Sequence, residues 1–370
     1  MMYTAVKRPT RALSGVLVVA VMTKPFPCPH GRCAYCPGGP EYGTPQSYIG
    51  NEPALMRGIQ TGFDPYLQTQ LRIRQYEILG YRPSKIDVVV MGGTFTAMPL
   101  DYQEWFITNI YTAANRYPYP KPNPLPQLEK AIEENETAPI RVVGLTLETR
   151  PDWCKERHVD AMLRFVATKV ELGVQSIYDD VLKRVDRGHT VKDVVEATRI
   201  LKDSGFKVAY HIMPGLPGSD PDRDVEMVKE IFENPDFRPD MLKIYPTLVV
   251  EGTKLYELWK KGEYRALTDE EAVEIIARMY KYIPRWVKII RIQRDIPAQL
   301  IVAGPRKANL RELVERRAIE LGIPINDIRF REVGRQTMYR CSKVEKVEIT
   351  KEIYEASKGV EVFLAAEDVK

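Results

Sequence analysis

Apolar residues recur along most of the chain with two alternating periods. Dense runs of β-branched and other apolar residues predict buried strands at 14–22, 85–94, 140–152, 168–176, 206–218, 240–249 and 286–296. Between the strands, apolar residues spaced three and four positions apart predict helices at 66–81, 100–115, 126–135, 154–166, 191–205, 222–234 and 268–283. This alternation indicates repeated β–α units and therefore a parallel sheet.

Six or seven such units predict an α/β fold, a partial TIM-like (β/α)6 barrel rather than a two-unit dinucleotide-binding half. The first apolar run follows a basic start, so it could also be a signal peptide; its β-branched content favours a strand. After about residue 295 the pattern weakens to a helix at 307–322 and strands in the last thirty residues. We therefore expect a barrel over 1–294, a basic linker over 295–345 and a small α+β extension that begins at 346.

Composition adds limits but no function. The chain has 370 residues, of which 44% are hydrophobic and 28% charged, as in an ordinary soluble protein. No apolar run reaches the roughly 18 residues that a membrane span requires. The five cysteines do not suggest a secreted disulfide framework, so a cytoplasmic location is expected.

Three of the five cysteines lie in one loop rich in proline and glycine, "PFPCPHGRCAYCPGGPEYG" (25–43). Cys28, Cys33 and Cys36 have the spacing C-x4-C-x2-C. Zinc would need a fourth ligand, for which His30 is available, and a disulfide plus one thiol is a further alternative. Three thiolates could also hold a [4Fe–4S] cluster and leave one iron open to a substrate such as S-adenosylmethionine.

Several long stretches carry a resemblance that favours the cluster. They include "CPHGRCAYCPGGPEYGTPQSYIGNEPALMRGIQTGFDPYLQTQ", "VVVMGGTFTAMP", "GLTLETRPDWC", "VELGVQSIYDDVLKRVDRGHT", "AYHIMPGLPG" and "LKIYPTLVVEGTKLYELW". In these the chain resembles the catalytic subunit of Elongator, a radical S-adenosylmethionine (SAM) enzyme family that modifies the wobble uridine of tRNA. The resemblance implies a radical SAM barrel, a [4Fe–4S] cluster on the three loop cysteines, SAM, and acetyl-CoA as the carboxymethyl source. It also implies that an adenosyl radical takes hydrogen from the acetyl-CoA methyl group, and that the resulting carbon radical adds to C5 of uridine 34.

The same resemblance implies the residues of the site. Side chains and glycines at or near strand ends would bind SAM, namely Tyr35, Gly92, Gly93, Thr94, Glu148, Glu171, Gln175, Arg184 and His211. Lys85 aligns with a lysine that the family uses for acetyl-CoA. The family usually continues into an acetyltransferase-like domain with a glycine-rich acetyl-CoA loop, which the residues after 335 do not offer.

Net charge is only +4, but its distribution is uneven. Nine basic residues against three acidic ones lie between 285 and 317, and a strand plus an amphipathic helix with solvated charges would explain them equally well. With tRNA (the anticodon stem-loop) as substrate, we expect a phosphate-binding face made of Arg72, Arg74, Arg285, Lys288, Arg291, Arg294, Arg306, Lys307, Arg311, Arg316 and Arg317. The partners could also include a second copy of the chain or Elongator-type proteins.

Two alternatives to this function stay open on the sequence. One is another radical SAM enzyme, of the methylthiotransferase or heme-pathway oxidase kind. The other is a tRNA-binding scaffold whose iron–sulfur cluster is structural.

Overall fold

The structure, a computed structural model, describes residues 13–369. By its internal contacts the chain divides into two compact units, which are described separately. The first consists of residues up to Gly31, Gly38–Thr149 and Glu156–Val170. The second consists of Arg32–Pro37, Arg150–Lys155 and Glu171 onward.

The main sheet has seven strands in the order β1-β2-β3-β4-β5-β6-β8. Their bounds are Leu17–Met22, Lys85–Met91, Arg141–Thr149, Lys169–Gln175, Lys207–Ile212, Met241–Ile244 and Lys288–Ile292. The pairs β1–β2, β2–β3, β5–β6 and β6–β8 are parallel. The predicted parallel α/β sheet is therefore confirmed, and its seven strands lie in the seven runs predicted as strands.

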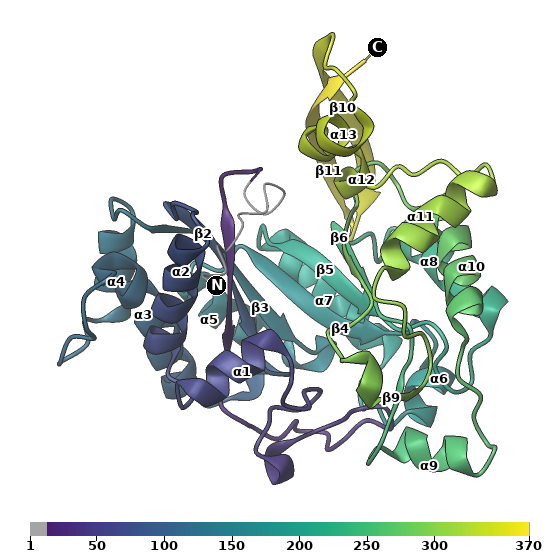
Figure 1. The fold of residues 1–370 in the computed structure, drawn as a ribbon, viewed down its shortest axis with the longest axis horizontal. Helices are drawn as coiled ribbons and strands as arrows, with labels where there is room; N and C mark the ends of the chain where they lie inside the picture. The colour runs from purple at the N-terminus through teal and green to yellow at the C-terminus, as the bar shows by residue number, and fades with distance from the viewer. Residues whose placement is uncertain (1–12, 370) are drawn as a thin grey trace, which may run out of the picture. The chain divides into compact units, whose positions relative to one another are not determined.

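The first unit carries strands β1–β3 and the helices α1–α5, which span Pro53–Gln60, Pro65–Ile78, Leu100–Arg116, Leu128–Asn135 and Glu156–Arg164. Helices α2, α3 and α4 pack side by side (Figure 1). The residues at the start of helix α2 explain why the helix begins there. Asp64 accepts a hydrogen bond from the Leu67 N–H at 3.1 Å, and Pro65 occupies the first turn, where its missing N–H costs nothing.

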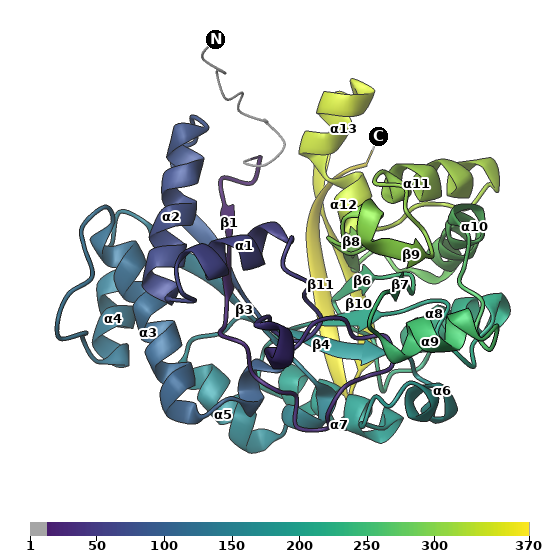
Figure 2. The same cartoon turned by 60° about the horizontal axis from the view of Figure 1, so that its bottom comes forward.

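The second unit carries strands β5, β6 and β8 and the helices α6–α11, which span Asp179–Arg184, Val191–Asp203, Pro221–Glu233, Lys254–Lys260, Asp269–Met279 and Leu310–Glu320. Capping boxes fix the starts of α7 and α10, through Thr190 with Asp193 and Thr268 with Glu271. Helices α10 and α11 pack together (Figure 2). A two-stranded antiparallel sheet of β7 (Val249–Val250) and β9 (Ile301–Ala303) completes the unit's outer part.

The end of the chain forms two short helices, α12 (Ile328–Arg331) and α13 (Val333–Arg340), and a hairpin of β10 (Val347–Ala356) and β11 (Gly359–Asp368). The hairpin packs on the second unit, because Tyr354 stacks on Trp286 with ring centroids 3.9 Å apart. The predicted terminal strands are thus confirmed, whereas α12 and α13 were not predicted. Within residues 13–369, no helix is both long and apolar enough to cross a membrane.

Candidate radical SAM site

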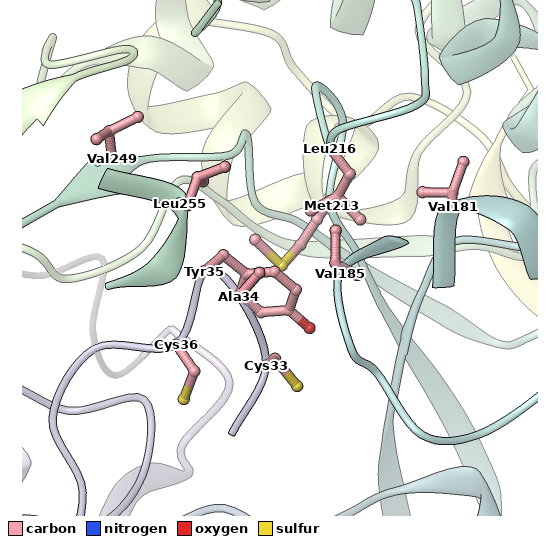
Figure 3. Close-up of a cluster of buried hydrophobic side chains, with 10 residues drawn as sticks. All are labelled: Cys33, Ala34, Tyr35, Cys36, Val181, Val185, Met213, Leu216, Val249 and Leu255. Atoms are coloured by element: carbon pink, nitrogen blue, oxygen red, sulfur yellow. The ribbon is translucent and has the colours of Figure 1, made fainter. Parts of the chain in front are cut away.

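The loop segment Cys33–Cys36 is held in the second unit by its backbone. The Ala34 N–H donates to the Val185 carbonyl at 2.9 Å, and the Ala34 carbonyl accepts from the Leu255 N–H at 2.8 Å. Cys33 and Cys36 are each only 5% exposed and belong to a cluster of buried apolar side chains, and both sulfurs point away from the other members of that cluster (Figure 3). Because Ala34 is anchored in this way, the backbone that carries the thiols of Cys33 and Cys36 has little freedom to move.

Polar groups of the second unit surround the sulfur of Cys33. Arg187 donates from Nη1 to Cys33 Sγ over 3.6 Å, and its Nη2 donates to the Gly173 carbonyl at 2.5 Å. The side chain of Tyr35 points toward Cys33 (Figure 3). Burial, together with the charge of Cys33, raises the pKa of Tyr35 well above its usual range, so its hydroxyl keeps its proton.

The third loop cysteine, Cys28, belongs to the first unit. Its backbone N–H donates to Gln46 Oε1 at 2.8 Å, and its Sγ lies 3.5 Å from Thr94 Oγ1. The glycines that follow β2 permit this arrangement. Gly92 has φ 136°, and a Cβ there would meet Thr23 Oγ1 at 1.9 Å; a Cβ on Gly93 would lie 3.9 Å from Cys28 Sγ. The predicted Gly92-Gly93-Thr94 motif thus lies directly against the predicted cluster ligand.

Three charged or titratable side chains meet inside the second unit. Glu171 is 2% exposed; it accepts from Lys243 Nζ and lies 3.0 Å from His211 Nε2. Burial alone would raise the pKa of Glu171, but the ammonium of Lys243 and the ring of His211 hold it well below its usual range. A fixed carboxylate at this place can accept hydrogen bonds from a ligand's hydroxyl or amino groups.

Gln175, the last residue of β4, has an unusual backbone for a residue with a side chain, with φ +69°. Its carbonyl accepts from the Met213 N–H at 2.8 Å. Its side-chain Oε1 is buried and finds no hydrogen-bond partner among residues 13–369. A buried amide oxygen without a partner costs free energy unless a ligand supplies a donor, so Gln175 fits a ribose hydroxyl.

The remaining predicted residues are Glu148, Arg184 and Lys85. Glu148, near the end of β3, accepts from the Tyr48 hydroxyl at 3.4 Å within the first unit. Arg184 is exposed and lies over the turn at Gly218, where a Cβ would come within 3.2 Å of its Cδ. Lys85 is exposed at the amino end of β2, about 20 Å of strand away from the glycines at the carboxyl end. The structure therefore does not bring Lys85 together with the predicted SAM site.

The residues present fit a cluster held by thiolates. No disulfide joins cysteines within the described part of the chain. Cys154 is buried apart from the loop, and burial raises its pKa to about 12, which keeps it a thiol. The Cys33 sulfur accepts a hydrogen bond from the Arg187 guanidinium, a neighbour that suits a cluster ligand better than a disulfide sulfur.

Most of the predicted basic face is already paired with carboxylates or carbonyls of the chain. Arg285 donates to Glu367 at 2.6 Å, Lys307 to Glu270 at 3.0 Å and Arg317 to Glu274 at 2.7 Å. Similar contacts join Arg291 to Asp295, Arg306 to the Val302 carbonyl, Arg311 to the Ile289 carbonyl, Arg72 to the Tyr76 hydroxyl and Arg74 to Glu77. Lys288 and Arg294 are half-buried and Arg316 is exposed.

Sequence reasoning missed four residues that this geometry singles out. Lys243 lies in the stretch "LKIYPTLVVEGTKLYELW", which was not expected to supply a site residue, and its role depends on strand register, which pairs it with His211. Arg187 lies three residues after Arg184, which the resemblance selects, and burial distinguishes the two arginines. Arg329 and Arg335 add positive charge near Arg311. Burial lowers the pKa of Arg329, and the charges of Arg311 and Arg335 lower it further.

The fold and the cysteine loop define a protein of the radical SAM class, and family models agree. A model described as the Radical SAM superfamily matches residues 25–231, and a Radical SAM C-terminal domain matches residues 239–320.

The chain is 53% identical over 370 residues to a tRNA uridine(34) acetyltransferase of Methanocaldococcus jannaschii, covering 98% of this chain and 67% of the relative. It is 46% identical to the human Elongator complex protein 3, covering 98% and 66%. The archaeal Elp3 structure of Methanocaldococcus infernus superposes with a TM-score of 0.83 at 46% identity, over 96% of this chain and 75% of that chain. The chain therefore belongs to the radical SAM superfamily and, within it, to the family of tRNA uridine(34) acetyltransferases and Elongator complex protein 3; it spans about two thirds of the length of these curated relatives.

Proposed function

We propose that this chain is the radical SAM part of an enzyme that modifies C5 of uridine 34 in tRNA, with acetyl-CoA as the carboxymethyl source. The observation that carries the proposal is the cysteine loop. Two of its thiols are buried with their sulfurs on one side, one beside a fixed guanidinium, and the third lies against Thr94. The relatives' name, tRNA uridine(34) acetyltransferase, supports the substrate and the acetyl donor.

Cys28, Cys33 and Cys36 would hold the cluster. When bound, a three-cysteine [4Fe–4S] cluster supplies the electron that cleaves the sulfonium C–S bond of SAM. Thr94 and the backbone of Gly92 and Gly93 would receive the amino end of SAM, because neither glycine carries a side chain of its own.

The interior of the second unit would bind the nucleoside end of SAM. Gln175 offers its unpartnered Oε1 to a hydroxyl donor, and Glu171 offers a carboxylate whose charge Lys243 and His211 preserve. These side chains orient the ligand and take no proton during binding, because the pKa of Glu171 lies well below neutrality.

The basic segment 285–317 would bind the phosphates of the tRNA. Three of its cations, Arg285, Lys307 and Arg317, form surface pairs, each worth only about 0–1 kcal/mol, so a phosphate can replace the carboxylate partner at little cost. Arg329 and Arg335 extend the proposed face. We further propose a cytoplasmic location and partner proteins of the Elongator kind or a second copy of this chain.

Anaerobically purified protein tests the proposal. We expect about four irons and four sulfides per chain, an optical or EPR signal that changes when SAM is added, and release of 5′-deoxyadenosine that tRNA and acetyl-CoA stimulate. Cys33→Ala should lose iron, sulfide and SAM cleavage, whereas Cys341→Ala, which removes an exposed cysteine outside the loop, should keep all three. One zinc without sulfide would overturn the proposal, and tRNA binding without SAM cleavage would point to a scaffold.

A further inference from the structure

Arg187 occupies a buried and rigid position beside one cluster ligand. Arg187 is 7% exposed, and its guanidinium donates to two acceptors, Cys33 Sγ at 3.6 Å and the Gly173 carbonyl at 2.5 Å. Its backbone is fixed as well, since Arg150 donates from Nη1 to the Arg187 carbonyl at 2.8 Å. Arg150 is itself 2% exposed. The positive charge near Cys33 is therefore built into the fold.

The three loop sulfurs face different groups. Cys33 faces the Arg187 cation, Cys28 faces the neutral hydroxyl of Thr94 at 3.5 Å, and Cys36 Sγ lies 3.8 Å from the Pro37 carbonyl oxygen. A charged donor stabilises negative charge on a sulfur roughly twice as strongly as a neutral one. Arg32 also donates from Nε to the Cys36 carbonyl at 2.9 Å, so that cation contacts backbone and not a sulfur. A cluster corner bound at Cys33 would thus have a cation that donates directly to its ligand sulfur.

We propose that Arg187 is a positioning residue that raises the reduction potential of the cluster through Cys33, a role that rests on the function proposed above. One-electron reduction of a thiolate-bound cluster adds one unit of negative charge, shared between iron and sulfur. A fixed cation near a ligand sulfur stabilises the reduced form more than the oxidised form, because its attraction grows with that charge. The electron comes from a low-potential one-electron donor; no bond is broken and no proton is transferred.

This role would act on the supply of reduced cluster. A higher potential leaves a larger fraction of the cluster reduced at a given donor potential. Arg187 increases that fraction without touching SAM, acetyl-CoA or tRNA.

An EPR-monitored redox titration with dithionite tests the proposal, on reconstituted full-length protein in the absence of SAM. Arg187→Met should lower the midpoint potential by at least about 59 mV, which is a tenfold loss in the one-electron reduction equilibrium. Arg187→Gln, which keeps a neutral donor, should fall between Met and wild type. Arg187→Lys, which keeps the charge, should lie closest to wild type.

Arg199→Met provides the matched control, because it removes the same charge from an exposed pair with Asp203 on α7. It should leave the midpoint potential unchanged, since solvent and salt screen a surface charge. Equal potentials in wild type, Arg187→Met and Arg187→Gln would overturn the proposal, and so would an equal shift in Arg199→Met. If Arg187→Met binds no cluster, the midpoint potential of Arg187→Gln is compared with that of wild type, and equal potentials would again overturn the proposal. Loss of the cluster in all three Arg187 variants would show a role in assembly instead.

Iron and sulfide content separates this inference from the proposed function. Wild-type protein without a cluster contradicts the function. Wild-type protein with a cluster, but with a potential that does not respond at Arg187, contradicts only the role of this arginine.

Discussion

Charged side chains of the second unit occur in two contrasting settings. Lys243 and Glu171 meet inside it, with side chains 9% and 2% exposed. Arg317 and Glu274 meet on its outer segment, with side chains 38% and 41% exposed. The first pair cannot separate without leaving a charge in a poorly solvated place, whereas each partner of the second can turn to water.

The difference shows which charges can serve which task. A buried pair holds one geometry, which suits residues that must orient a small ligand. A surface pair exchanges its partner readily, which suits a face that binds and releases a polyanion. Four experiments test whether the two settings differ as much as this comparison requires.

The largest effect is expected at Lys243. Lys243→Met leaves Glu171 buried without its cation, and breaking a buried pair on one side typically costs about 3–5 kcal/mol. Urea denaturation at pH 7 measures the change. The double variant Lys243→Met/Glu171→Gln should recover part of the loss, because no isolated charge remains. A loss below about 1 kcal/mol in the single variant would place this pair with the surface pairs.

The pH dependence of this pair has a definite sign. Because the folded-state pKa of Glu171 is depressed, its contribution to stability is present above the unfolded pKa and is lost as the pH falls through the folded pKa. In Lys243→Met the part of that contribution that comes from Lys243 is absent at every pH. The difference in stability between wild type and variant should therefore shrink as the solution is made strongly acidic.

Asp224 is a buried carboxyl whose pKa is raised, whereas that of Glu171 is lowered. Burial raises its pKa to about 6, although Ser219 Oγ and the Gly215 N–H donate to it at 2.6 and 2.7 Å. Between its unfolded pKa and about 6 the folded state binds the extra proton, so stability falls as the pH rises through this window, by about 3 kcal/mol at most. Asp224→Asn should flatten that fall in urea titrations at pH 4.5, 5.5 and 6.5.

The control for Asp224 is Asp180, which pairs with Arg223 on the surface and has a lowered pKa. Asp180→Asn should leave the fall between pH 4.5 and 6.5 in place. If Asp224→Asn keeps the same slope as wild type, the raised pKa does not govern stability in this window.

The third effect concerns tRNA. Arg291→Glu/Arg294→Glu should weaken tRNA binding at least about tenfold and reduce the salt slope by about 2, because two phosphate contacts are lost. Arg278→Glu, on α10 outside the segment, is the control and should bind tRNA as wild type does. Cluster content should not change in either variant. Normal binding by the double variant would show that the phosphate-binding face lies elsewhere.

The sequence predicted the repeating architecture well, because long buried runs and long amphipathic helices leave strong periodic patterns. Strands β1 to β6 and β8 and the helices α2, α3, α7 and α8 all lie where the pattern predicted. It missed α6, α9 and α12, which have four to seven residues, too few for a helical period to stand out.

Motifs and the family resemblance predicted which segments form the site. The individual side chains that meet there could be identified only from the contacts in the structure. The sequence placed Thr94 with the loop cysteines, and the structure brings it to Cys28. It could not find Lys243, because a single lysine in an apolar strand gives no signal until register pairs it with His211. It selected Arg184 and passed over Arg187, since only burial separates these two arginines, which lie three residues apart.

The smallest effect is expected at the surface pair, and it completes the comparison. A double-mutant cycle of Arg317→Ala and Glu274→Ala should give a coupling of about 0.2–1 kcal/mol in 0.1 M salt. The coupling should fade at 1 M salt, where the Debye length falls to about 3 Å. A coupling above about 2 kcal/mol would mean that this pair is held as rigidly as a buried one. Arg317 would then be a structural residue, because replacing Glu274 by a phosphate would cost too much for reversible tRNA binding.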